Sequence, residues 1–71
     1  MNEETLRLMK LIEHWATHND EHGERFMESA SEAEEIGLYD AAEELRLASA
    51  ESRKVSVHLR EALKKITEQG G

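Results

Sequence analysis

Apolar residues recur through the first half of the chain at alternating spacings of four and three, the spacing of a helix packed against another helix. Asn2 is a favourable N-cap residue before this pattern, and Glu3 and Glu4 follow it, where acidic side chains suit a helix N-terminus. The pattern predicts a helix over about residues 3–36. Its packing seam comprises Leu8, Ile12, Trp15, Asn19, His22, Phe26, Ser29, Ala33 and Ile36.

A second seam predicts another helix over about residues 40–67, after a loop at 37–39. Gly37 favours the end of the first helix, because glycine adopts the left-handed conformation that terminates helices. Asp40 followed by Glu43 resembles a capping box at the start of the second. The terminal Gly70-Gly71 is expected to be a frayed tail. The second seam comprises Ala42, Leu45, Ser49 (or Ala48), Ser52, Val55, Ser56, Leu59, Leu63 and Ile66.

These two helices predict a single all-α domain over residues 1–71, an antiparallel helical hairpin. The alternative is a three-helix bundle with a break near Asn19–Gly23. Asp20 could cap a new helix there, and a glycine such as Gly23 costs about 1 kcal/mol in a helix interior. The seam keeps its phase across this segment, which favours an unbroken helix. The predicted core residues are Ile12, Trp15, Phe26, Leu45, Leu59 and Leu63.

Further apolar residues lie outside both seams, and a lone hairpin would leave them uncovered. A chain of 71 residues also buries only a thin core. Two hairpins pairing into a four-helix bundle would supply the missing cover, so we expect a homodimer. The additional apolar residues are Leu6, Met9, Ala16, Met27 and Ala30 in the first half and Leu47, Val57 and Ala62 in the second.

Composition and charge narrow the possible functions. The chain has no cysteine, which excludes disulfides and thiolate metal sites. Its net charge of −7 argues against binding nucleic acid. No stretch approaches the roughly 20 apolar residues that span a bilayer, and the acidic start does not resemble a secretory signal. We therefore expect a cytoplasmic protein that does not associate with membranes. The acidic run from Asp20 to Glu44 could also dock an unidentified basic protein partner.

The chemically distinctive feature is a stripe of three histidines, His14, His18 and His22, each four residues from the next. Side chains four apart on a helix are neighbours, so two of these imidazoles can bind one metal ion. All three cannot, because the outer pair lies about 12 Å apart along the helix axis. In a hairpin that turns near Leu38, His58 lies level with His18 and could supply another ligand.

Imidazole ligands suit Ni²⁺, Zn²⁺, Cu²⁺ or Co²⁺. Glu21 and Glu61, each three residues after a histidine, are candidate fourth ligands or hydrogen-bond acceptors for the ligating rings. Asn19 could orient a histidine or a bound water. The Glu-x-x-His pattern of di-iron bundles, the His-Glu-x-x-His protease motif and glycine-rich phosphate loops are all absent, so we expect no enzymatic activity.

Two other interpretations of the histidines remain open. Histidine is common on the flank of a helical seam, where its ring packs and one nitrogen stays hydrated. The stripe could also form a pH switch, because neighbouring imidazoles repel one another once protonated. The alternative function is a helical oligomerisation or adaptor module whose histidines are packed at an interface, as the incomplete apolar cover of a lone hairpin suggests.

The segment His14-Trp15-Ala16-Thr17-His18-Asn19-Asp20-Glu21-His22 resembles an uncharacterised family of small helical domains from archaea and anaerobic bacteria with an HWxxHNxxH signature. Phe26, the Ile36-Gly37-Leu38 segment and the Ala41–Leu45 run are also similar to it. This chain departs from the family at Gly23, where similar sequences usually have alanine. Family members can occur beside small nickel-handling proteins, so the resemblance implies metal binding.

The leading hypothesis from the sequence is therefore a non-enzymatic module that binds a divalent transition metal, nickel or zinc. Its expected ligands are His18, His22 and His58, and His14 competes for either end of the site.

Overall fold

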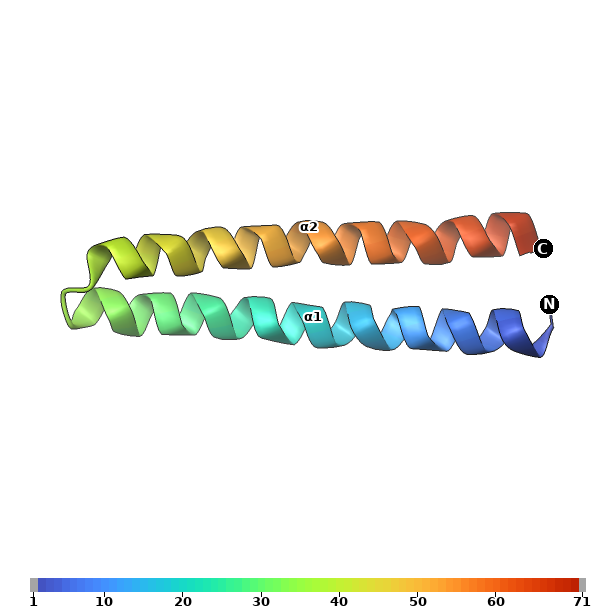
Figure 1. Ribbon diagram of the computed structural model, residues 1–71, viewed down its shortest axis with the longest axis horizontal. Helices are drawn as coiled ribbons and strands as arrows, with labels where there is room; N and C mark the ends of the chain where they lie inside the picture. The colour runs from blue at the N-terminus through green and yellow to red at the C-terminus, as the bar shows by residue number, and fades with distance from the viewer. Residues whose placement is uncertain (1, 71) are drawn as a thin grey trace.

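The computed structural model describes residues 2–70 and forms an antiparallel hairpin of two long helices (Figure 1). Helix α1 spans Glu3–Glu35 and helix α2 spans Tyr39–Gly70. They lie side by side in a rod whose Cα atoms extend over 53 × 15 × 10 Å. The predicted all-α hairpin is confirmed. Helix α1 continues unbroken through Asn19–Gly23, so the three-helix alternative is wrong.

The ends of α1 follow from its sequence. The Asn2 side chain accepts a hydrogen bond from the Thr5 amide at 2.8 Å, as expected of an N-cap. At the other end Gly37 has a φ of +84°, which glycine adopts without strain. The Leu38 amide donates to the Ala33 carbonyl at 2.8 Å, and the Gly37 amide donates to the Glu34 carbonyl. These two bonds form a Schellman motif, which makes the turn short and well defined.

Helix α2 differs from the prediction at both ends. It begins at Tyr39, so the residue before the helix is Leu38 and not the expected Asp40. The predicted Asp40–Glu43 capping box therefore does not form the start of the helix. The Schellman bonds fix where the chain turns, and Asp40 instead lies in the first turn, where its charge favours the helix dipole. At the far end α2 continues to Gly70, because the residues after Thr67 contain no helix-breaking signal. Gly71 lies outside the described residues.

Alternate positions of the packing seam of α1 differ by one residue from the predicted ones. Ile12, Asn19, Phe26 and Ala33 lie on it as expected. The expected Leu8, Trp15, His22 and Ser29 are replaced by their C-terminal neighbours Met9, Ala16, Gly23 and Ala30. Trp15 is 47% exposed, so its expected place in the core is wrong for the single hairpin. Small side chains let the two helix backbones approach closely, which a stripe containing Trp15 would prevent.

The seam of α2 agrees with the prediction except at Val55, which is exposed. Of the predicted core residues, Ile12 is buried, while Phe26, Leu45, Leu59 and Leu63 are half-buried. The fully closed part of the core, near the turn, consists of Ala30, Ala33 and Ala42 with Leu45 packed against them. The hairpin is therefore held by small residues and has few large buried side chains.

Three serines of α2 donate hydrogen bonds to carbonyl groups of α1 through the middle of the interface. Ser49 reaches Gly23 and Ser52 reaches Asn19, both at 2.9 Å, while Ser56 reaches Ala16 at 3.4 Å. Such bonds between side chain and backbone require close helices. A Cβ added at Gly23 would lie 3.3 Å from the Ser52 hydroxyl, which shows how closely the two helices approach.

The two broad faces of the hairpin differ in chemistry. On the charged face, defined by Asp20, Glu34, Arg46, Arg53 and Arg60, α1 supplies carboxylates and α2 supplies guanidinium groups. Arg60 pairs with Asp20, and Arg46 pairs with Glu34. The three arginines recur every seven residues and so lie along one side of α2. These partly exposed pairs set the register more than they add stability.

The pair between Asp20 and Arg60 predicts how stability depends on pH. Hydrogen bonds from Arg60 hold the pKa of Asp20 below its usual value. Because the pKa is lowered in the folded state, the contribution of Asp20 is present above the unfolded pKa and disappears as pH falls through the folded one. We expect Asp20→Asn to lower the melting temperature near pH 6, and the lowering to be smaller near pH 2.5, because protonation of Asp20 weakens the pair as pH falls. Thermal unfolding followed by circular dichroism measures both values, with Glu24→Gln as an exposed control; an equal difference at the two pH values would contradict the assignment.

Candidate functional site

The histidine stripe begins beside the packing seam at His22 and continues round α1 to His14, on the side opposite the seam. The rings of His14 and His18 are stacked with centroids 5.9 Å apart, and those of His18 and His22 meet edge to face at 4.5 Å. The stack continues from His22 to Phe26 at 6.3 Å. His22 is half-buried, whereas His14 and His18 are exposed. The nitrogens of two imidazoles that bind one ion lie about 3 Å apart. His18 and His22 have the closer rings and are therefore the better candidate pair.

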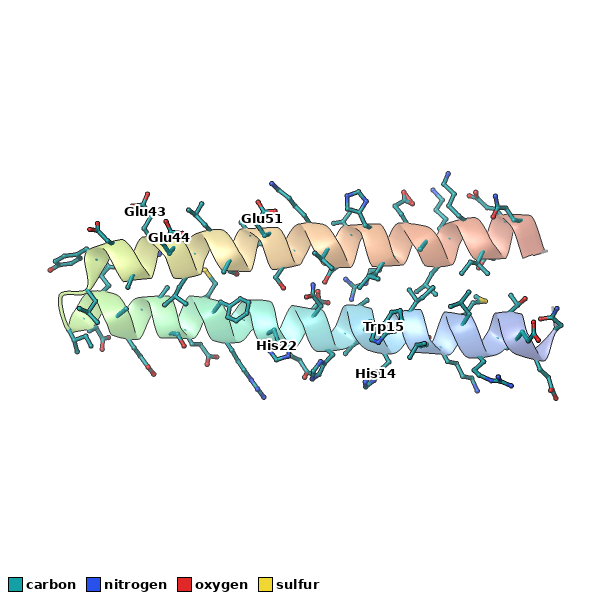
Figure 2. The ribbon with its side chains drawn as sticks, in the orientation of Figure 1. His14, Trp15, His22, Glu43, Glu44 and Glu51 are labelled. Atoms are coloured by element: carbon teal, nitrogen blue, oxygen red, sulfur yellow. The ribbon has the colours of Figure 1, made fainter. Side chains whose placement is uncertain are left out.

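Helical geometry separates the three histidines by direction. At 100° per residue, His22 lies beside the seam, His18 lies farther round the same side, and His14 lies opposite the seam. Figure 2 shows His14 at the edge of α1 farthest from α2. A ligand bound on the broad face of the hairpin would therefore meet His22 and His18 but not His14.

His58 does not join the stripe within one chain. It is exposed on α2, on the side of that helix that faces away from α1. His18 and His58 thus lie at opposite edges of one broad face. Within residues 2–70, the histidines and carboxylates nowhere form a group of three or more that could hold a metal ion in a single hairpin. The Asp20–Arg60 pair joins the helices two residues beyond His18 and His58, so the two histidines lie near one level along the rod but point to opposite edges.

The three polar residues assigned to supporting roles also have definite places. The Asn19 amide group donates to the Ser52 carbonyl and, at 2.9 Å, to the Ser56 hydroxyl, so it is engaged across the helix interface. It forms part of the packing seam rather than orienting a histidine. Glu21 and Glu61 are exposed on the outer sides of α1 and α2.

The broad face opposite the charged one is apolar. The apolar spacing in the sequence does not distinguish this exposed face from the interface between the two helices. This apolar face is defined by Leu8, Leu11, Trp15, Ala48, Val55 and Ala62. The large side chains from α1 are between 44% and 47% exposed, and Val55 is 48% exposed. His18 and His22 lie along the same face on α1. The seven-residue spacing of Leu8, Trp15 and His22 is the sequence signal of the apolar face, but the same spacing also fits a packing seam.

A shallow groove lies on the charged face beside Gly23. Its lining includes Asp20, Glu24, Met27, Ser52 and Arg53. No histidine lines this groove, so it offers no continuation of the histidine stripe. No helix within residues 2–70 combines the length and apolar character needed to cross a membrane.

Comparison with known protein families matches the chain to Domain of unknown function (DUF8180) over residues 8–66. The match includes the histidine stripe, the turn and His58. Searches of curated proteins and of solved structures found no match to this chain. Because the match covers most of its length, the chain belongs to the DUF8180 family of small domains.

Proposed function

We propose that this protein is a helical self-association module, in which the apolar faces of two hairpins pack together into a four-helix bundle. The observation that carries the proposal is the apolar face itself, where Leu8, Leu11 and Trp15 are nearly half exposed. The hairpin's own core consists mainly of alanine and serine, which contributes little burial energy for its length. Covering the apolar face would supply the burial that the single chain lacks.

The sizes of the side chains favour one arrangement of the two copies. On the apolar face α1 carries the large residues Leu8 and Trp15, whereas α2 carries Ala48, Val55 and Ala62. Well-packed helices place large side chains opposite small ones. Helix α1 of each copy should therefore lie on α2 of the other, with Trp15 between Val55 and Ala62. This arrangement has a two-fold axis parallel to the helices.

Charge at the edges of the apolar face supports the same arrangement. Arg25 lies at the edge of α1, and Glu51 lies at the edge of α2. Counted from the turn at Gly37, Arg25 and Glu51 stand 12 and 14 positions away, so they are level to within about 3 Å. Packing α1 on α2 of the second copy would bring these opposite charges together twice. Nearer the turn the like charges of Glu32 and Glu44 would also meet.

Sedimentation equilibrium at several tens of micromolar tests the proposal. We expect the wild-type chain to have the mass of two chains and Trp15→Glu to be largely monomeric, because the substitution places a charge at the centre of the buried face. Leu47→Glu is the matched control. Leu47 is 54% exposed, comparable to Trp15, but lies on the outer side of α2.

The control should keep the dimeric mass, and circular dichroism should show both variants to be helical. A monomeric wild-type chain at these concentrations would contradict the proposal. Equal dissociation of the two variants would show that the apolar face is not the interface.

The second candidate function is binding of a divalent transition metal such as nickel or zinc. The specific observation in its favour is the 4.5 Å separation of the His18 and His22 rings, which suits two ligands of one ion. The resemblance of His14–His22 to the HWxxHNxxH signature, with its nickel-handling neighbours, points in the same direction. Two imidazoles alone make a weak site, so this function requires a further ligand.

A further inference from the structure

We propose that the dimer completes a metal site in which His18 and His22 of one copy are joined by His58 of the second copy. Two equivalent sites would form in each dimer, one at each edge of the interface. The inference rests on the proposed self-association, and it adds the ligand set and the chemical class of the ligand. It also explains why His18 and His58 share a level along the rod without meeting in one hairpin.

The directions of the His18 and His58 side chains favour a site shared between two copies. His18 and His58 occupy equivalent positions on α1 and α2, at the outer edges of the apolar face. Within one hairpin these edges point away from each other. When α1 packs on α2 of a second copy, the outer edge of one meets the outer edge of the other. His18 then faces His58 of the second copy across the rim of the interface.

The levels along the rod agree as well. His18 lies 19 positions before Gly37 and His58 lies 21 positions after it. Helix rise then separates their levels by about 3 Å. A two-fold axis parallel to the helices leaves levels unchanged, so the same separation holds between the copies. His58 of the second copy is within reach of an ion held by His18 and His22.

The donor set defines the kind of ion. Three neutral imidazoles favour borderline divalent metals such as Ni²⁺ and Zn²⁺ over Mg²⁺ or Ca²⁺, which require oxygen ligands. Glu21 and Glu61 are each three residues after a ligating histidine, on the outer side of its helix. Either carboxylate could complete the coordination or accept a hydrogen bond from a ligating ring. His14 faces away from the interface and has no place in the site.

Mixing two deficient variants tests the proposal. The double variant His18→Ala with His22→Ala lacks one half of each site, and His58→Ala lacks the other half. Neither variant alone can form a complete site in its own dimer. A mixed dimer would regain one complete site, with His58 from the first chain and His18 and His22 from the second. A site within a single chain would not be regained.

Calorimetric titration with Ni²⁺ alone, and separately with Zn²⁺ alone, provides the measurement. We expect the wild type to bind one ion per chain, each deficient variant to bind at least tenfold more weakly, and His14→Ala to match the wild type. Re-equilibrated mixtures of the two deficient variants should recover wild-type affinity at one ion per mixed dimer.

Each other outcome overturns the inference in a recognisable way. A dimeric wild type that binds neither ion excludes the site but leaves self-association intact. Strong binding that survives His58→Ala, or a mixture that binds no better than its components, excludes the ligand from the second copy. A monomeric mass removes both the dimer and the site.

Discussion

Ala30→Leu is expected to destabilise the hairpin by about 3 kcal/mol, because it forces a large side chain between helices that approach closely. Ala30 is fully buried and packs with Ala33 and Ala42 beside the turn. The added carbons have no space there unless the helices separate, and separation would weaken the neighbouring contacts of Leu45. For a chain of this size, the melting temperature should fall by roughly 15 °C.

Thermal unfolding followed by circular dichroism at fixed chain concentration measures this effect. Ala50→Leu is the matched control, because Ala50 is exposed on α2 and the substitution makes the same chemical change. The control should alter the melting temperature by no more than a few degrees. If Ala30→Leu unfolds at the wild-type temperature, the helices cannot be as close as the structure places them.

Ile12→Ala is expected to have the second large effect, a loss of about 2–4 kcal/mol. Ile12 is the large apolar side chain buried most completely among the described residues, at 7% exposure. Its truncation would leave a cavity in the helix interface. Because the other fully buried residues are small, this loss is a large share of the total stability.

Urea unfolding at one chain concentration measures the loss, since the stability of a self-associating chain depends on concentration. Leu47→Ala is the control, because Leu47 is 54% exposed. It should shift the midpoint only slightly. A similar shift for the two variants would show that Ile12 does not anchor the core.

The sequence predicted the number, direction and approximate bounds of the helices, because Gly37 and the alternating apolar spacing are strong local signals. It did not predict which of two adjacent stripes on α1 forms the interface. Leu8 and Trp15 fit the spacing as well as Met9 and Ala16 do. Hydrophobicity favoured the larger residues, but the approach distance of the helices depends on size, so the smaller stripe packs inside.

The candidate site was predicted in part. The spacing of His14, His18 and His22 correctly indicated neighbouring rings, and counting from the turn placed His58 near the level of His18. Direction around the helix was missed, because it depends on the orientation of the seam. His18 lies at the outer edge of α1 and His58 at the outer edge of α2, so they point to opposite edges of the hairpin. Asn19 lies on the seam as predicted, but its amide group donates to Ser52 and Ser56 of α2 and is therefore not directed at a histidine.

The position of the alanine cluster beside the turn has a consequence for the folding pathway. Contacts among Ala33, Ala42 and Leu45 close a short loop and therefore cost little chain entropy. The far ends of α1 and α2 come together only after a long segment is ordered. Folding should nucleate at the turn and propagate along the rod. Substitutions at Ala42 should then slow folding, and those at Ile66 should mainly accelerate unfolding.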